Sequence, residues 1–193
     1  MTTTLDTATG LAGDLRTVLD EISAVLDRLD ATAADAAVDT LLAADRILVT
    51  GEGRSGFMAK AFAMRLMHLG LPVHVIGETT CPAVAGTDTL VAISGSGTTA
   101  GTVRVARTAA DLGATVLAVS TDPASPLAQT ATSTVVVPAA TKHRRPGEPA
   151  TIQPLSSLFD QVTHLLLDAV CLGVATRRGV DNGAAAARHA NTE

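Results

Sequence analysis

The chain can be understood outward from one stretch, Leu90-Val91-Ala92-Ile93-Ser94-Gly95-Ser96-Gly97-Thr98-Thr99-Ala100-Gly101. Its apolar start predicts a buried strand, and a helix-compatible segment follows at 103–112. Between the two, small residues let the backbone approach a ligand, and backbone N–H groups gather at the positive end of a helix dipole. This chemistry suits a phosphate. Ser and Thr also cap helices, so a simple capping turn remains an alternative.

A second stretch upstream has the same design. The apolar run 46–50 is followed by Gly51-Glu52-Gly53-Arg54-Ser55-Gly56, which leads into a helix. In a parallel sheet, two such turns lie at the carboxyl edge, where ligands bind. The pair therefore favours the phosphate interpretation. A nucleotide is not the expected ligand, because neither turn carries a P-loop lysine or a G-x-G-x-x-G motif.

The rest of the chain alternates between strand and helix patterns. This alternation predicts an α/β fold with a five-stranded parallel sheet flanked by helices. The expected strands are 46–50, 72–76, 89–93, 114–119 and 133–137, and the expected helices are 55–69, 100–112, 124–130 and 155–178.

Residues 1–45 precede the first strand. Leu15, Leu19, Ile22 and Leu26 recur at helical spacing within 13–29, and 33–44 is rich in Ala. We expect an N-terminal helical hairpin packed on the same domain, which continues as 46–193. Its apolar stripe is expected to bury either on the core or on another subunit.

Composition excludes several classes of protein. The net charge of −5 and pI of about 5.4 argue against binding to nucleic acid or to an anionic membrane. We expect no membrane span and no signal peptide, and hence a cytoplasmic protein. Cys81 and Cys171 are expected to be free thiols, since their spacing fits no metal site.

Several motifs together resemble the sugar isomerase (SIS) domain and, within it, the 6-phospho-3-hexuloisomerases. The resemblance covers the chain from about residue 46 to its end. The motifs that carry it are Gly51-Glu52-Gly53-Arg54-Ser55-Gly56, Met64-Arg65-Leu66-Met67-His68, Gly77-Glu78-Thr79-Thr80-Cys81-Pro82, Ser94-Gly95-Ser96-Gly97-Thr98-Thr99, Ile152-Gln153-Pro154-Leu155-Ser156-Ser157-Leu158-Phe159-Asp160-Gln161 and Arg188-His189-Ala190-Asn191.

This resemblance implies a three-layer SIS-type fold and a specific reaction. The enzyme would interconvert D-arabino-3-hexulose 6-phosphate and fructose 6-phosphate through a cis-enediol, in formaldehyde fixation by the ribulose monophosphate route. It would act beside a 3-hexulose-6-phosphate synthase and form a homotetramer. Neither a cofactor nor a metal is expected. Alternatives are an isomerase of arabinose 5-phosphate or of a heptulose phosphate, and a sugar-phosphate sensor without catalysis.

The same resemblance assigns roles to residues. Asp160 is the expected base, although the family usually has Glu there. His68 and His189 are further catalytic candidates, and either could act in a neighbouring subunit's site. The expected substrate-binding residues are Gly53, Arg54, Ser55, Thr79, Thr80, Ser94, Gly95, Ser96, Gly97, Thr98 and Thr99.

Each of these assignments has a purely structural alternative. Asp160 could simply favour a helix dipole, and His68 could be a satisfied, half-buried histidine. His164, four residues after Asp160, is expected at the surface or as the partner of Asp160. The Pro138–Pro154 segment carries Lys142-His143-Arg144-Arg145 and is interpreted as a solvated loop in preference to a lid over the phosphate.

Overall fold

Five parallel strands form the central sheet of the computed structural model, which describes residues 10–192. Their order is β2-β1-β3-β4-β5, so the strand that is followed by Ser94 is the central one. Leu90 of this strand pairs with Leu48 on one side and Val116 on the other. The strands are β1 (Ile47–Gly51), β2 (Val73–Val75), β3 (Thr89–Ile93), β4 (Thr115–Ser120) and β5 (Ser133–Val136).

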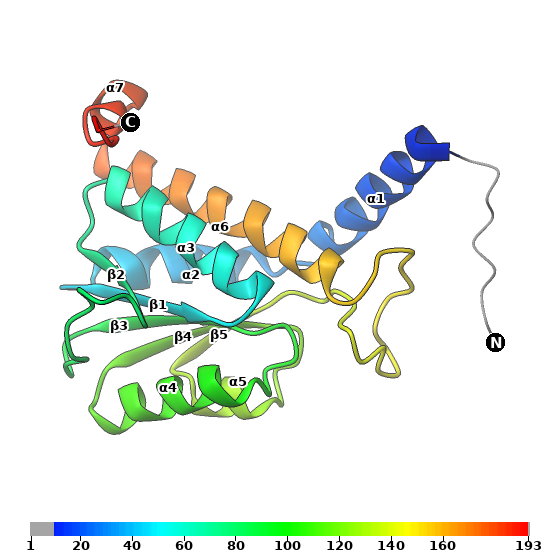
Figure 1. The fold of residues 1–193 in the computed structure, drawn as a ribbon, viewed down its shortest axis with the longest axis horizontal. Coiled ribbons are helices and arrows are strands. Elements are labelled where there is room, and N and C mark those ends of the chain that lie inside the picture. The colour runs from blue at the N-terminus through cyan, green and yellow to red at the C-terminus, as the bar shows by residue number, and fades with distance from the viewer. Residues whose placement is uncertain (1–9, 193) are drawn as a thin grey trace.

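Helices cover both faces of the sheet (Figure 1). On one face lie α2 (Ala31–Leu42), α3 (Arg54–His68) and α6 (Ser157–Arg178), and on the other lie α4 (Ala100–Asp111) and α5 (Pro126–Thr130). The expected three-layer α/β fold with five parallel strands is therefore confirmed.

Alternation along the strands builds a separate core on each face, because successive side chains point to opposite sides of the sheet. Val91 and Ile93 pack with Phe62 and Phe159 under α3 and α6. Leu90, by contrast, belongs to the core under α4 and α5. With few aromatic residues available, aliphatic side chains fill most of both cores.

The predicted elements differ from the observed ones mainly at their ends. The helix expected at 124–130 begins at Pro126, because the Ser125 hydroxyl caps it by accepting a hydrogen bond from the N–H of Ala128. The last long helix begins at Ser157 rather than 155, after Leu155 adopts a positive φ of 53°. Beyond it, the chain forms one more short helix, α7 (Asn182–Ala186).

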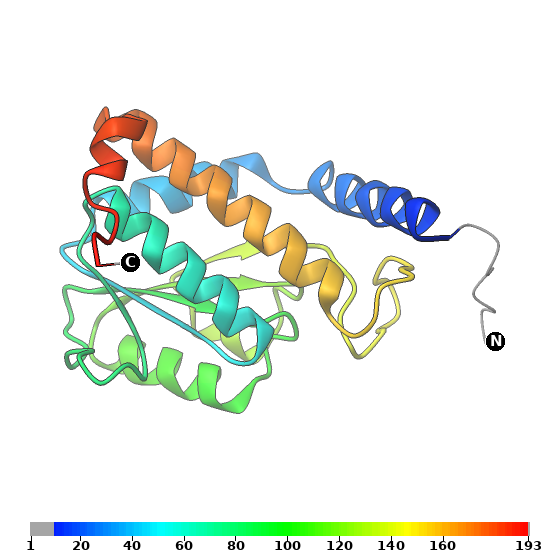
Figure 2. The ribbon, with the colours of Figure 1, turned by 45° about the horizontal axis from the view of Figure 1, so that its top comes forward.

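The N-terminal helices are present, but their arrangement is more open than a hairpin. Figures 1 and 2 show that α1 (Gly10–Leu26) and α2 succeed each other along α6, with α1 reaching beyond the sheet. Val25 at the end of α1 is buried, whereas Leu11, Leu15 and Leu19 are exposed. The apolar stripe is thus buried on the core only in its second half.

Helix α6 is long and apolar enough to cross a membrane, by length and composition alone. More than half of its apolar window is buried inside the protein, however, and it packs against α1, α2 and α3. These are the properties of a core helix in a soluble protein. Both cysteines are free thiols, and Cys171 is buried on this helix.

Candidate functional site

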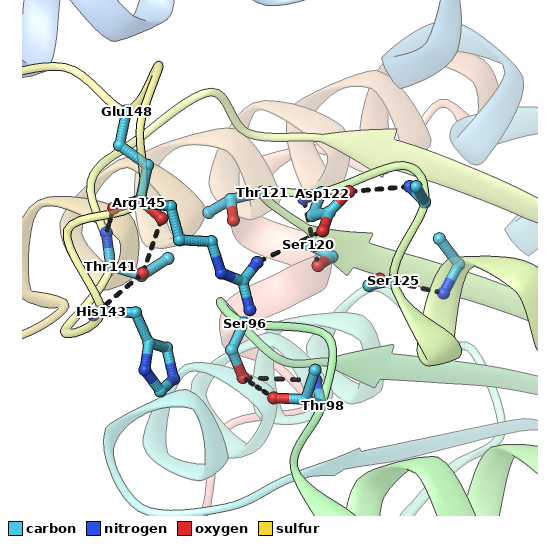
Figure 3. Close-up of polar contacts among 12 residues, drawn as sticks. Ser96, Thr98, Ser120, Thr121, Asp122, Ser125, Thr141, His143, Arg145 and Glu148 are labelled. Atoms are coloured by element: carbon cyan, nitrogen blue, oxygen red, sulfur yellow. Dashed lines mark hydrogen bonds and ion pairs between the residues drawn. The ribbon is translucent and has the colours of Figure 1, made fainter.

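The turn after β3 is held in shape by its own hydroxyl groups. Ser94 and Thr99 are joined through their side-chain oxygens at 2.9 Å, and the Ser96 Oγ accepts hydrogen bonds from the N–H and hydroxyl of Thr98 (Figure 3). Gly97 makes the turn with a positive φ of 63°. Thr99 precedes α4 without capping it, because its hydroxyl is engaged with Ser94. The first N–H groups of α4 therefore lack a side-chain cap and suit an anion.

The turn after β1 contacts the first turn of α6. The Arg54 Nε donates to Oδ2 of Asp160 at 3.0 Å, and the Ser55 hydroxyl donates to Oδ1 at 3.2 Å. Asp160 is only 2% exposed, whereas more than half of the Arg54 side chain is open to solvent. Both carboxylate oxygens are thus fixed by donors from one neighbouring turn.

Burial and these donors act on Asp160 in opposite directions. Burial raises the pKa of its carboxyl, while the hydrogen bond and positive charge of Arg54 and the hydroxyl of Ser55 lower it. Burial is the larger effect, so the pKa of Asp160 lies above its ordinary value. A carboxylate with a raised pKa is a stronger base, which suits removal of a proton from carbon.

One cavity of about 320 Å³ joins the two turns and the carboxylate. Its volume lies in the range of small-molecule sites. Seven of the residues expected from the sequence line it: Gly53, Arg54, Ser55, Gly95, Ser96, Thr99 and Asp160. Ser94, Gly97 and Thr98 shape the turn beneath them.

Four further residues that were not expected from the sequence also line this cavity: Glu52, Lys142, Leu155 and Ser156. The Glu52 carboxylate lies against Gly101 in the first turn of α4, where a helix dipole favours a negative charge. Glu52 and Ser156 lie inside motifs already quoted, so their position there was the available signal. Lys142 comes from the segment between β5 and α6, and only its charge could have indicated it.

The structure does not bring His68 and His189 to the cavity of the same chain. They stack on each other with ring centroids 5.2 Å apart. His68 ends α3, about 20 Å along the helix from Ser55 at 1.5 Å per residue. Burial, followed by the charges of His189 and Arg65, lowers the pKa of His68.

The remaining polar candidates also lie apart from the cavity. Thr79 and Thr80 are exposed after β2, and neither belongs to the residues that line it. His164 is exposed and lies 3.7 Å from Asp168, so it is a surface residue and does not pair with Asp160. Within residues 10–192, no three His, Cys, Asp or Glu side chains gather in a way that could hold a metal ion.

Comparison with known proteins gives a consistent family. The model of the SIS domain matches residues 40–166. The 3-hexulose-6-phosphate isomerase of Mycobacterium gastri is 39% identical over 183 residues, which cover 95% of this chain and 92% of that protein. The protein of the same name from Bacillus subtilis is 39% identical over 160 residues, covering 83% of this chain and 86% of its own length.

A solved structure extends this likeness to three dimensions. A hypothetical protein of Methanococcus jannaschii, for which a function of 3-hexulose-6-phosphate isomerase was inferred, superposes with a TM-score of 0.81. The two sequences are 28% identical, and the match covers 93% of this chain and 98% of that one. The likeness therefore includes the N-terminal helices as well as the sheet.

Proposed function

Because the chain belongs to the SIS domain family and is a sugar-phosphate isomerase of it, we propose that it interconverts D-arabino-3-hexulose 6-phosphate and fructose 6-phosphate. The observation that carries this proposal is the single cavity that holds both the Ser96–Thr99 turn and Asp160. The turn suits a phosphate, and Asp160 offers a base. A phosphate held away from the reacting carbons fixes the sugar in register with the base.

The reaction moves one carbonyl by one carbon. Asp160 takes the proton from C2 of the 3-ketose, the electron pair of that bond forms the C2=C3 double bond, and O3 becomes an enediolate oxygen. The proton then returns to C3 while the proton of O2 passes to O3, which leaves the carbonyl at C2. Asp160 is regenerated as carboxylate, and no electron acceptor is needed.

The proposal extends to the assembly and its setting. A cytoplasmic homotetramer, acting after a 3-hexulose-6-phosphate synthase in formaldehyde fixation, fits the resemblance stated above. Two helices provide exposed apolar surface for contacts between subunits: α1 with Leu11, Leu15 and Leu19, and α3 with Phe57 and Met64. In that assembly, His68 and His189 would serve the site of a neighbouring subunit.

The direct test is a substrate comparison with purified protein. We expect formation of fructose 6-phosphate from D-arabino-3-hexulose 6-phosphate and little turnover of arabinose 5-phosphate. Preference for arabinose 5-phosphate would contradict the proposed substrate. Tight binding of fructose 6-phosphate without turnover of any sugar phosphate would favour the sensor alternative instead.

The hydroxyl groups of the turn after β3 give the first prediction. Ser96→Ala and Thr99→Ala should each weaken binding of fructose 6-phosphate about tenfold or more, since a hydrogen bond to a charged group contributes about 1.5–3 kcal/mol. Titration calorimetry measures the effect. Thr108→Ala is the matched control, because its hydroxyl donates only to the Arg104 carbonyl of its own helix. Unchanged affinity in both site variants would place the phosphate elsewhere.

Arg54 gives a prediction about pH. Its guanidinium lowers the pKa of Asp160, so Arg54→Ala should raise that pKa further. Because the base must be deprotonated, kcat/KM falls as pH drops through this pKa, and the fall should begin at a higher pH in the variant. KM should also rise if Arg54 contacts the phosphate. Arg107→Ala, an exposed arginine of α4, should leave the pH profile unchanged.

A further inference from the structure

The segment between β5 and α6, residues 138–154, is here named the strap. Its middle is exposed at Lys142, His143 and Arg144, as expected for a solvated loop. Figure 3 shows that it nevertheless overhangs the carboxyl edge of the sheet, with the Arg145 guanidinium between Asp122 and the Ser96–Thr98 turn. Arg145 forms an ion pair with Asp122 at 3.2 Å. The strap is thus attached beside the proposed phosphate turn.

Internal bonds fix the shape of the strap. The Glu148 carboxylate accepts hydrogen bonds from the N–H and the hydroxyl of Thr141, at 2.8 and 2.7 Å. The Arg144 guanidinium donates to three backbone carbonyls, those of Thr141, Gln153 and Leu155. Both ends of the strap are therefore drawn together by one side chain.

Helix α1 holds the second end of the strap. The Glu21 carboxylate accepts hydrogen bonds from the Thr151 hydroxyl, the Ile152 N–H and the Gln153 side-chain amide. These bonds fix the chain just before the turn that leads into α6 and Asp160. The strap is consequently anchored at two places, to Asp122 through Arg145 and to Glu21 through its second end.

Lys142 occupies a special position in this framework. Arg144 donates its hydrogen bonds to carbonyl groups, and Arg145 pairs with Asp122. Lys142, in contrast, lines the cavity together with Asp160. Its N–H donates to the Ser156 hydroxyl at 3.0 Å, and the carbonyl of Ser156 accepts from the N–H of Asp160. Its main chain is thus fixed next to the helical turn that carries the base. Across residues 10–192, the structure records no ion pair for its ammonium group.

The proposed reaction benefits from a cation at this place. As the base removes the proton, negative charge develops on the oxygen that was the carbonyl. The Nε of Arg54 already donates to the base, and His68 lies about 20 Å along α3 within the same chain. Lys142 lines the cavity, and its main chain is fixed near the turn that carries Asp160. The ammonium group at the end of its flexible stem can therefore reach a sugar oxygen in the cavity.

We propose that Lys142 is a catalytic residue whose ammonium group binds the carbonyl oxygen of the sugar and stabilises the enediolate as it forms. This inference rests on the proposed isomerase function and adds to it a residue supplied by the strap. Lys142 donates hydrogen bonds throughout and keeps its proton, so the proton balance of the reaction is unchanged.

The chain offers a matched pair of variants, because Lys60 and Lys142 are its only lysines. Lys142→Met keeps an unbranched stem and the strap's backbone bond but removes the charge. We expect kcat to fall about 10²–10³-fold, as for loss of one oxyanion donor, with KM changed far less. Lys60→Met should have the kcat and KM of the parent, because Lys60 is an exposed residue of α3 that pairs with Glu78. Lys142→Arg should recover part of the lost turnover.

Two kinetic outcomes would overturn the proposal. A raised KM with unchanged kcat would make Lys142 a phosphate contact, and parental values for both would remove it from the site. A melting temperature equal to that of the parent excludes a collapsed strap as the cause of lost turnover. If the parent protein itself does not isomerise the 3-ketose phosphate, the proposed function is wrong, and the proposed role of Lys142 is wrong with it.

Chemical labelling gives a readout that does not depend on turnover. Trinitrobenzenesulfonate should modify both lysines in the free protein, and peptide masses distinguish them. Fructose 6-phosphate should protect Lys142 and leave Lys60 reactive, whereas inorganic phosphate alone should protect Lys142 much less. Equal protection by inorganic phosphate, or none by fructose 6-phosphate, would contradict the proposed contact with the carbonyl oxygen.

Discussion

Replacing Asp160 with Asn should lower kcat about 10²–10⁴-fold, the usual contribution of a positioned acid or base. The amide keeps the shape of the carboxylate but cannot accept a proton from carbon. Affinity for fructose 6-phosphate should survive, because the turn after β3 is unchanged. Asp168→Asn is the matched control, since Asp168 lies on the same helix but is exposed beside His164.

Asp160→Glu separates two explanations for the shorter side chain at this position. If the backbone has adapted to Asp, the extra methylene misplaces the carboxylate, and a shift of about 1 Å can cost about a hundredfold in rate. If a water molecule relays the proton, Glu will match or exceed the parent. Parental turnover in Asp160→Asn would instead remove Asp160 from the mechanism and leave His68 of a neighbouring subunit as the next candidate.

Gly97→Ala should be the most damaging change in the turn after β3. Gly97 has a φ of 63°, where a side chain costs about 1–2 kcal/mol. A Cβ there would also collide with the side chain of Ser125 and lie 2.9 Å from the Ser120 Oγ. Overpacking adds about 1–3 kcal/mol. Denaturant unfolding should therefore show a large loss of stability, and binding of fructose 6-phosphate should be lost as the turn shifts.

Gly113→Ala provides the control for this change. Gly113 has a similarly positive φ of 88°, but its Cβ would meet only the Gly86 Cα at an ordinary 3.9 Å. The Gly113→Ala variant should lose only the stability that corresponds to the backbone strain, and it should keep its affinity for fructose 6-phosphate. Equal losses of stability and affinity in the two variants would contradict the argument that a collision with Ser125 shifts the turn.

The sheet and the two turns could be predicted because their signals are local. An apolar run that stops at Ser94 or Gly51 predicts both the strand and the turn that ends it. The carboxyl edge of a parallel sheet then brings the turns together without further information. Asp160 needed more, since only the resemblance to a family pointed to it.

The strap and the N-terminal helices could not be predicted from local patterns. Four basic residues in a row give no indication that Arg144 bonds carbonyls, Arg145 pairs with Asp122 and Lys142 lines the cavity. These roles depend on contacts between segments far apart in sequence, such as Glu21 with Gln153. The leucine stripe of α1 predicted a helix but not how much of it the same chain covers.

Solvent exchange tests the central claim most directly. Fructose 6-phosphate is incubated with the protein in D₂O and followed by proton NMR. A base that works between C2 and C3 should replace the hydrogen at C3 with deuterium while both hydrogens at C1 are retained, and Asp160→Asn should slow this exchange about 10²–10⁴-fold. Exchange at C1 instead of C3, or exchange at the parental rate in Asp160→Asn, would contradict the account.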